Sequence, residues 1–179
     1  MQREEWNVVK ILSCARHDWL NRLQLIKGNI ALNRLDRVNE IIEEIIREAG
    51  HESKLTNTKL AAFAEYVMTY NWRGTPLHLE IEVLGDAKDL SSYDAVLAKW
   101  TMEFMQMLEA GADGMSTHHV SVSLLIENES VRFFFDFSGI LTNIQSIQDW
   151  LEEEKEKQRL KIIEKHISKE ELSVVVEIV

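Results

Sequence analysis

The sequence VVKILSCARHDWLNRLQLIKGNIA occupies residues 8–31 and determines the architecture of the N-terminal part of the chain. Its apolar residues recur at intervals of three and four, which is the period of an α-helix with one buried face. The residues on this apolar stripe are Val8, Leu12, Ala15, Trp19, Leu23, Ile26 and Ile30. We therefore expect an amphipathic helix whose stripe faces a core.

A second helical segment follows closely, with Asp36 as a plausible N-cap. Only residues 33–36 separate the two segments, which predicts an antiparallel helical hairpin. The first helix is also apolar at Ile11, Leu20 and Leu25, an arc too broad for one partner helix to cover. Either two hairpins pair into a homodimeric four-helix bundle through a two-fold interface, or the hairpin packs on the rest of its own chain. We favour the homodimer.

The remainder of the chain has a mixed pattern. Two segments have helical character, 60–72 and 90–110, and five have the alternating or β-branched character of strands: 77–84, 119–127, 131–138, 160–167 and 172–179. The charge run at 152–157 fits a solvated helix or loop. The sequence thus predicts an α+β protein, with a helical hairpin over residues 1–55 and an α/β domain over residues 56–179.

Composition narrows the class of protein. The chain has 179 residues, 45% hydrophobic and 28% charged, as in globular proteins, and its single cysteine excludes an internal disulfide and a cysteine metal cluster. No apolar run reaches the roughly 18–20 residues of a membrane span, and no signal-peptide core follows the charged start, so we expect a cytoplasmic protein without a membrane partner. The net charge of −10 argues against nucleic acid as a partner. Residues 1–35 nevertheless hold six basic groups against three acidic ones, which suits an acidic protein partner.

The side of the first helix opposite the stripe is polar. At roughly 100° per residue, it carries Lys10, Ser13, His17, Asn21, Gln24 and Gly28. The plain interpretation is a solvated face with an incidental histidine. Two features favour a contact surface instead. The polar groups are mostly neutral, and Gly28 costs about 1 kcal/mol of helix stability relative to alanine, a cost that makes sense if another backbone must approach closely there.

Residues 13–29, SCARHDWLNRLQLIKGN, resemble the phosphoacceptor box of two-component histidine kinases, in which an exposed histidine is followed by an acidic residue and, four positions on, by asparagine. A longer series of matches is similar to the sporulation initiation phosphotransferase B family of spore-forming bacteria. The matching segments are RHDW at 16–19, LQLIKGN at 23–29, DRV at 36–38, HESKL at 51–55, EVLG at 82–85 and KDLS at 88–91.

This resemblance implies a phosphorelay intermediate that dimerises through a four-helix bundle and carries a degenerate kinase-ATPase-like domain. Such proteins receive a phosphoryl group from the aspartate of a single-domain response regulator and pass it to a DNA-binding response regulator that initiates sporulation. By the same resemblance His17 is the phosphorylated residue. The surrounding regulator-binding surface comprises Arg16, Asp18, Leu20, Asn21, Gln24 and Gly28.

The chemistry suits a histidine that works without a cofactor of its own. An ordinary imidazole is largely neutral near pH 7 and is a competent nucleophile, and Mg²⁺ is expected on the regulator. Residues 93–110 lack the asparagine that ATPase relatives use to hold Mg²⁺, glycine-rich phosphate loops are absent, and residues 136–139 are at most a remnant of an Asp-x-Gly-x-Gly box. We therefore expect no ATP binding. The alternatives are an ATP-dependent histidine kinase and a non-catalytic dimeric adaptor for response regulators.

Overall fold

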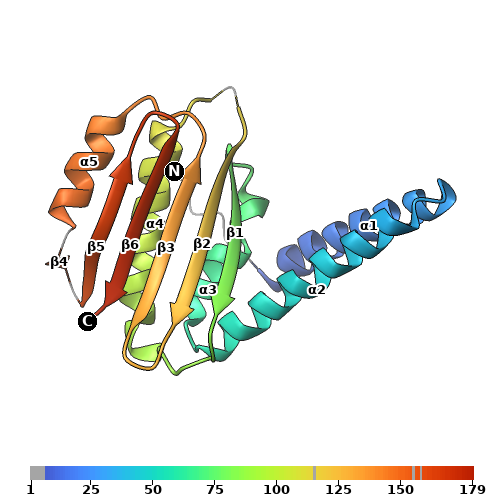
Figure 1. Ribbon diagram of the computed structural model, residues 1–179, viewed down its shortest axis with the longest axis horizontal. Coiled ribbons are helices and arrows are strands. Elements are labelled where there is room, and N and C mark those ends of the chain that lie inside the picture. The colour runs from blue at the N-terminus through green and yellow to red at the C-terminus, as the bar shows by residue number, and fades with distance from the viewer. Residues whose placement is uncertain (1–6, 115, 155, 158) are drawn as a thin grey trace. The chain divides into compact units, whose positions relative to one another are not determined.

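The computed structural model describes residues 7–114, 116–154, 156–157 and 159–179 (Figure 1). Arg3, Glu4 and Glu5, which enter the charge balance above, and Lys155 of the charge run lie outside the described residues. The chain divides into two compact units, Met1–Ala49 and Gly50–Val179. We describe each unit by itself.

The first unit is a helical hairpin, as expected. Helix α1 (Val8–Ala31) begins where the side chain of Asn7 accepts a hydrogen bond from the Lys10 amide at 2.9 Å. The chain turns through Asn33, whose φ of 54° is the left-handed conformation that asparagine tolerates. Helix α2 (Leu35–Asn57) then begins one residue before Asp36, so Asp36 lies in its first turn and is not the N-cap.

The apolar stripe of α1 differs from the expectation of a core-facing surface. No residue of α1 is buried, and Leu12, Trp19 and Leu23 are 59%, 56% and 55% exposed. In the hairpin part of α2, Val38 and Ile41 are buried, whereas Ile42 and Ile46 are exposed. Both helices of the hairpin therefore carry large apolar side chains that are exposed in the single chain.

The second unit contains most of the secondary structure. Its elements after α2 are α3 (Ala61–Met68), η1 (Tyr70–Arg73), β1 (Leu77–Leu84), η2 (Ser91–Tyr93), α4 (Asp94–Gly111), β2 (His118–Ile126), β3 (Val131–Ser138), α5 (Ile144–Glu153), β4 (Glu156–Lys157), β5 (Leu160–Ile167) and β6 (Glu171–Ile178). The sheet order is β1-β2-β3-β6-β5-β4, with β1 parallel to β2 and the other pairs antiparallel.

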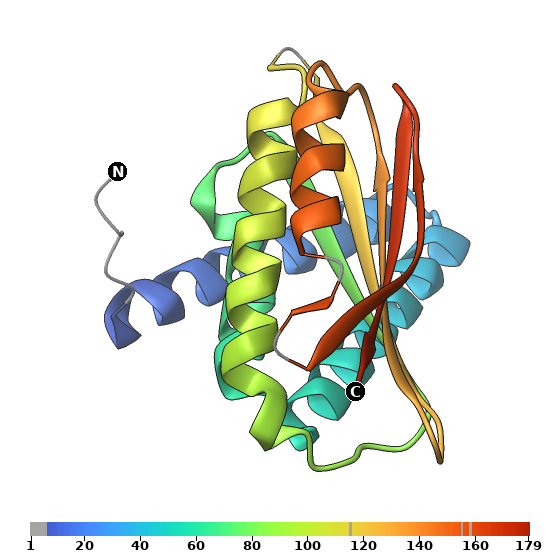
Figure 2. The ribbon, with the colours of Figure 1, turned by 90° about the vertical axis from the view of Figure 1, so that its left-hand side faces the viewer.

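The core of this unit lies between one face of the sheet and the helices. Alternate residues of β2 and β3 are buried, as expected for strands with one covered face. Helices α4 and α5 lie side by side against that face (Figure 2). An aromatic cluster of Trp100, Phe104, Phe135 and Trp150 joins them to the sheet, with ring centroids 5.1–5.9 Å apart. The α+β fold class predicted from the sequence is confirmed.

Two elements differ from the sequence prediction. Helix α2 continues through Gly50 to Asn57, and Leu55 near its end is fully buried in the core of the second unit. Helix α5 was not predicted as a separate element, although it buries Ile147 and Leu151 and begins where Asn143 accepts from the Ser146 amide. The contact boundary after Ala49 therefore falls within a continuous helix, six residues before the expected division at residues 55–56.

Candidate functional site on helix α1

His17 lies within α1, away from both helix ends, and its side chain is 73% exposed. A helix holds such a residue by its backbone hydrogen bonds, so the imidazole needs no packing to stay in place. Asn21 follows one turn later on the same face, because residues four apart in a helix are neighbours. Helix α1 thus presents the imidazole of His17 to solvent from a well-defined backbone position.

Two of the predicted residues contact the ring of His17, and both approach the same atom. Asn21 Nδ2 lies 3.2 Å from His17 Nδ1, and Asp18 Oδ1 lies 3.4 Å from it. Within the part of the chain that the structure describes, no residue forms a hydrogen bond or ion pair with Nε2 of His17. Nε2 is therefore the ring nitrogen available to an incoming group.

The other predicted residues share the helix without touching the ring. Arg16, Leu20, Gln24 and Gly28 are all exposed. An added Cβ at Gly28 would have no described atom within 4 Å, so no contact among the described residues requires a glycine at this position. The structure thus brings Asp18 and Asn21 to His17 and places the remaining four residues along the exposed surface of α1.

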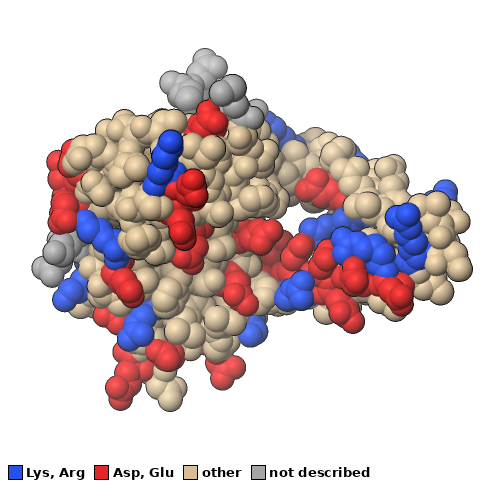
Figure 3. Space-filling view, turned by 45° about the horizontal axis from the view of Figure 1, so that its top comes forward, with Lys and Arg blue, Asp and Glu red and all other residues tan. Residues whose placement is uncertain are grey.

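Sequence reasoning did not foresee the ion pairs of the hairpin. Arg22 of α1 pairs with Glu48 of α2 and so ties the two helices together. Arg37 donates to Glu40 at 2.7 Å and to Glu44 at 3.3 Å, and its hydrogen bond to Glu40 is the largest of the causes that raise the Arg37 pKa. Figure 3 shows basic and acidic side chains mixed along the hairpin. The i,i+3 spacing of Arg37 and Glu40 was a visible signal, whereas the Arg22–Glu48 pair depends on how the helices align.

Two other histidines of the second unit hydrogen-bond to its backbone. His118 is buried, with Nε2 2.7 Å from the carbonyl oxygen of Asp113 and Nδ1 3.2 Å from the amide of Ile140. His51 Nδ1 accepts from the Val83 amide at 3.1 Å. Both rings therefore hold backbone segments of the second unit in place.

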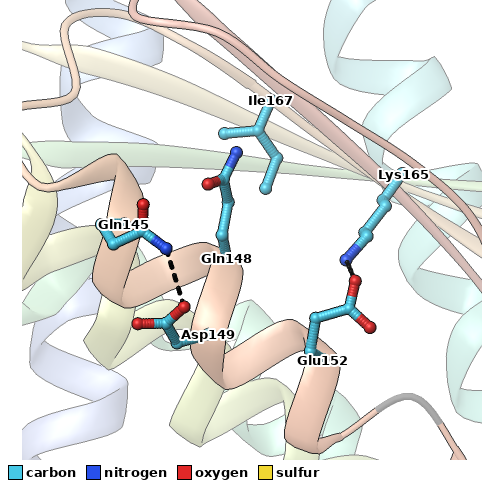
Figure 4. A pocket seen from close by; sticks show the side chains of 6 residues that line it. All are labelled: Gln145, Gln148, Asp149, Glu152, Lys165 and Ile167. Carbon is cyan, nitrogen blue, oxygen red and sulfur yellow. Dashed lines mark hydrogen bonds and ion pairs between the residues drawn. The ribbon is translucent and has the colours of Figure 1, made fainter.

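Two surface hollows in the described part of the second unit are lined largely by polar residues. One, between α5 and β5, is lined by Gln145, Gln148, Asp149, Glu152, Lys165 and Ile167 (Figure 4). Four of these polar side chains pair with one another, since Gln145 donates to Asp149 at 2.8 Å and Lys165 pairs with Glu152 at 2.5 Å. The other, about 500 Å³, lies on the uncovered face of the sheet and includes His119, Asp136 and His166. Burial raises the pKa of Asp136 there.

The described residues also lack the features of a metal centre and of a membrane span. They contain no group of three or more His, Cys, Asp or Glu side chains arranged to hold a metal ion. None of their helices combines the length and the apolar character needed to cross a bilayer.

The fold and the site together define a two-unit α+β protein that presents a solvent-exposed histidine on a helical hairpin. Residues 1–58 match the family described as sensor kinase SpoOB-type, alpha-helical domain, and residues 59–179 match that described as sporulation initiation phospho-transferase B, C-terminal. The chain belongs to the sporulation initiation phosphotransferase B family.

A curated relative and two solved structures extend the comparison. The chain is 40% identical over 144 residues to sporulation initiation phosphotransferase B of Bacillus subtilis strain 168, covering 79% of this chain and 75% of the relative. The catalytic domain of histidine kinase ThkA aligns with a TM-score of 0.41 and 14% identity, over 70% of this chain and 91% of that one. Acinetobacter baumannii histidine kinase AdeS aligns with a TM-score of 0.40 and 7% identity, over 90% and 96%.

Proposed function

We propose that this protein is a phosphorelay phosphotransferase in which His17 carries the phosphoryl group. The donor is the aspartyl phosphate of a single-domain response regulator, and the acceptor is the aspartate of a DNA-binding response regulator that initiates sporulation. The observation that carries the proposal is the exposed imidazole of His17, held on a regular helix with Nε2 open to solvent. Membership of the phosphotransferase B family supports a phosphotransferase function.

The transfer requires few groups on the histidine side. The lone pair of a ring nitrogen forms the N–P bond, the P–O bond to the regulator's aspartate breaks, and the electron pair leaves on that carboxylate. The regulator supplies Mg²⁺ and its acidic pocket, so no cofactor is needed on this chain. Arg16, exposed next to His17, is placed to attract that acidic pocket electrostatically.

We further propose that the protein acts as a homodimer. The apolar residues of α1 are exposed in the single chain, and burying a leucine or valine side chain contributes about 1.5–3 kcal/mol. A second hairpin supplies a matching surface, which would complete a four-helix bundle. His17 lies on the opposite side of α1 from the stripe, as expected from its position at roughly 100° per residue, and stays accessible in such a bundle.

The proposed relay uses regulators alone, in the cytoplasm, without ATP, nucleic acid or a membrane as partner. In the second unit, residues 136–138, the remnant of an Asp-x-Gly-x-Gly box, lie in β3 as regular strand with Asp136 on the uncovered face. Helix α4 carries no asparagine. Both features favour a structural domain over a kinase.

The test is phosphoryl transfer from a phosphorylated single-domain response regulator, without ATP, to the wild-type protein and to His17→Gln. We expect acid-labile, reversible labelling of the wild type and none of the variant, which should fold normally because His17 is exposed. Labelling of His17→Gln to the wild-type level would overturn the carrier role. Labelling from ATP alone would instead identify a kinase, and absence of labelling together with tight regulator binding would identify an adaptor.

A further inference from the structure

Two side chains make opposite demands on one nitrogen of His17. The carboxylate of Asp18 only accepts hydrogen bonds, so its contact with Nδ1 at 3.4 Å requires a proton on that nitrogen. The amide nitrogen of Asn21 only donates, so its contact at 3.2 Å requires a lone pair there. A neutral imidazole carries one ring proton and cannot satisfy both neighbours at once.

The buried ring of His118 shows the contrasting arrangement. Its Nε2 faces the carbonyl oxygen of Asp113 and its Nδ1 faces the amide of Ile140, so one nitrogen donates, the other accepts, and a single tautomer satisfies both. At His17 both contacts converge on Nδ1. Each neighbour therefore stabilises a different tautomer of the same ring.

We propose that Asn21 is a positioning residue that controls the reactivity of His17 through this tautomer, an inference that rests on the proposed function. When Asn21 donates to Nδ1, the ring proton is on Nε2, and neither nitrogen has a free lone pair. When Nδ1–H donates to Asp18, the lone pair is on Nε2, the open nitrogen. Asn21 thus holds the free protein in an unreactive form, and a docked regulator that draws its amide away releases the reactive one.

The transfer step balances in the reactive tautomer. Nε2 forms the bond to phosphorus, the P–O bond to the regulator's aspartate breaks, and its electron pair leaves on the carboxylate. The ring keeps its proton on Nδ1 and becomes an imidazolium whose charge faces Asp18. On transfer to the second regulator, a carboxylate oxygen of that regulator's aspartate forms a P–O bond, the N–P bond breaks, and its electron pair returns to Nε2. Asp18 therefore favours the reactive tautomer before transfer and stabilises the cation after it.

The direct test is the tautomer ratio of His17 in the full chain labelled with ¹⁵N-histidine, read from the chemical shifts of the two ring nitrogens. Asn21→Ala and Asn21→Asp should both move His17 toward the Nδ1–H form, by about three- to tenfold, the range that one hydrogen bond contributes. Asp18→Asn should move it the opposite way. The matched control is Asn29→Ala, because Asn29 is on the same helix but donates to the Leu25 carbonyl at 2.9 Å.

A ratio that is unchanged in Asn21→Ala, or that moves toward Nε2–H, would overturn the proposal. The second outcome would mean that the amide oxygen faces the ring and that both neighbours favour the same tautomer. Since Asp18→Asn tests the other contact independently, the inference stays falsifiable if one variant folds poorly.

The rate of reaction supplies a readout that no docking defect can mimic. Phosphoramidate is a small phosphodonor, and its reaction with His17 breaks a P–N bond and releases ammonia. Asn21→Ala should accelerate this labelling by the factor measured for the tautomer ratio, and Asp18→Asn should slow it; equal rates in all three proteins would contradict the proposal. If the regulator fails to label the wild type while the tautomer responds as expected, the proposed relay fails and this inference survives.

Discussion

The two units of this protein differ in where their apolar side chains lie. In the second unit, the sheet and helices bury a continuous core that includes Phe63, Phe104 and Phe133. In the hairpin, no residue of α1 is buried, and apolar side chains as large as Trp19 are exposed. The second unit is therefore complete as one chain, whereas the hairpin has a surface suited to another molecule. The buried core and the exposed apolar side chains thus lie in different units.

The largest effect on stability is expected in the core of the second unit. Phe133 is fully buried and packs edge-to-face on Phe63 with centroids 5.5 Å apart. Phe133→Ala should lower the free energy of unfolding by about 3–5 kcal/mol, because it leaves a cavity. Urea unfolding followed by tryptophan fluorescence measures this. Leu23→Ala, on the exposed stripe, is the control at protein concentrations low enough to keep the chain monomeric, and it should cost about 1 kcal/mol or less. Equal losses of unfolding free energy in the two variants would contradict the difference between the buried core of the second unit and the exposed stripe of α1.

Much of this contrast could not be predicted from the sequence. Periodicity predicted the strands at 77–84, 131–138 and 160–167 with the bounds that the structure has, because alternation depends only on one covered face. It also predicted the stripe of α1, but a helical period is the same whether the covering surface comes from the same chain or another. The short helix α5 was missed because its apolar positions are few and adjoin a charge run.

The residues of the candidate site could be predicted from the sequence more fully than the contacts between them. The pattern and the family resemblance identified His17, Asp18 and Asn21, and the structure brings these three together. That both neighbours meet the same ring nitrogen depends on side-chain rotamers, which spacing along a helix does not determine. The Arg22–Glu48 pair was equally hidden, since its partners lie on different helices.

The next largest effect concerns the surface of the hairpin. Leu23→Asp places a carboxylate in the proposed interface, where an unpaired charge is costly, so the dimer should dissociate at least about 100-fold more readily. Sedimentation equilibrium over a range of concentrations measures this, with circular dichroism showing that the second unit stays folded. Ser13→Asp is the matched control, because Ser13 is exposed on the same helix away from the stripe. If both variants dimerise like the wild type, α1 is not the interface.

The smallest effect is expected at Gly28 of the hairpin, which contrasts with Gly85 of the second unit. A Cβ at Gly85 would lie 2.2 Å from the carbonyl oxygen of Ile126, and its φ of +87° also requires glycine, so Gly85→Ala should destabilise the second unit. Gly28 is helical with nothing within 4 Å of an added Cβ. Gly28→Ala should therefore stabilise the protein by about 1 kcal/mol, which thermal unfolding measures.

Substitutions at Gly28 also distinguish the two explanations for this glycine, a surface that contacts a regulator and a plain solvated face. If a docking regulator approaches the helix backbone at this position, the stabilised Gly28→Ala should bind it more weakly, and Gly28→Arg should block phosphoryl transfer without unfolding the chain. Stopped transfer in Gly28→Arg with unchanged labelling by phosphoramidate would place the defect in docking, because the small donor needs no docked protein. Wild-type transfer rates in both variants would remove Gly28 from the contact surface and leave its cost to the helix unexplained.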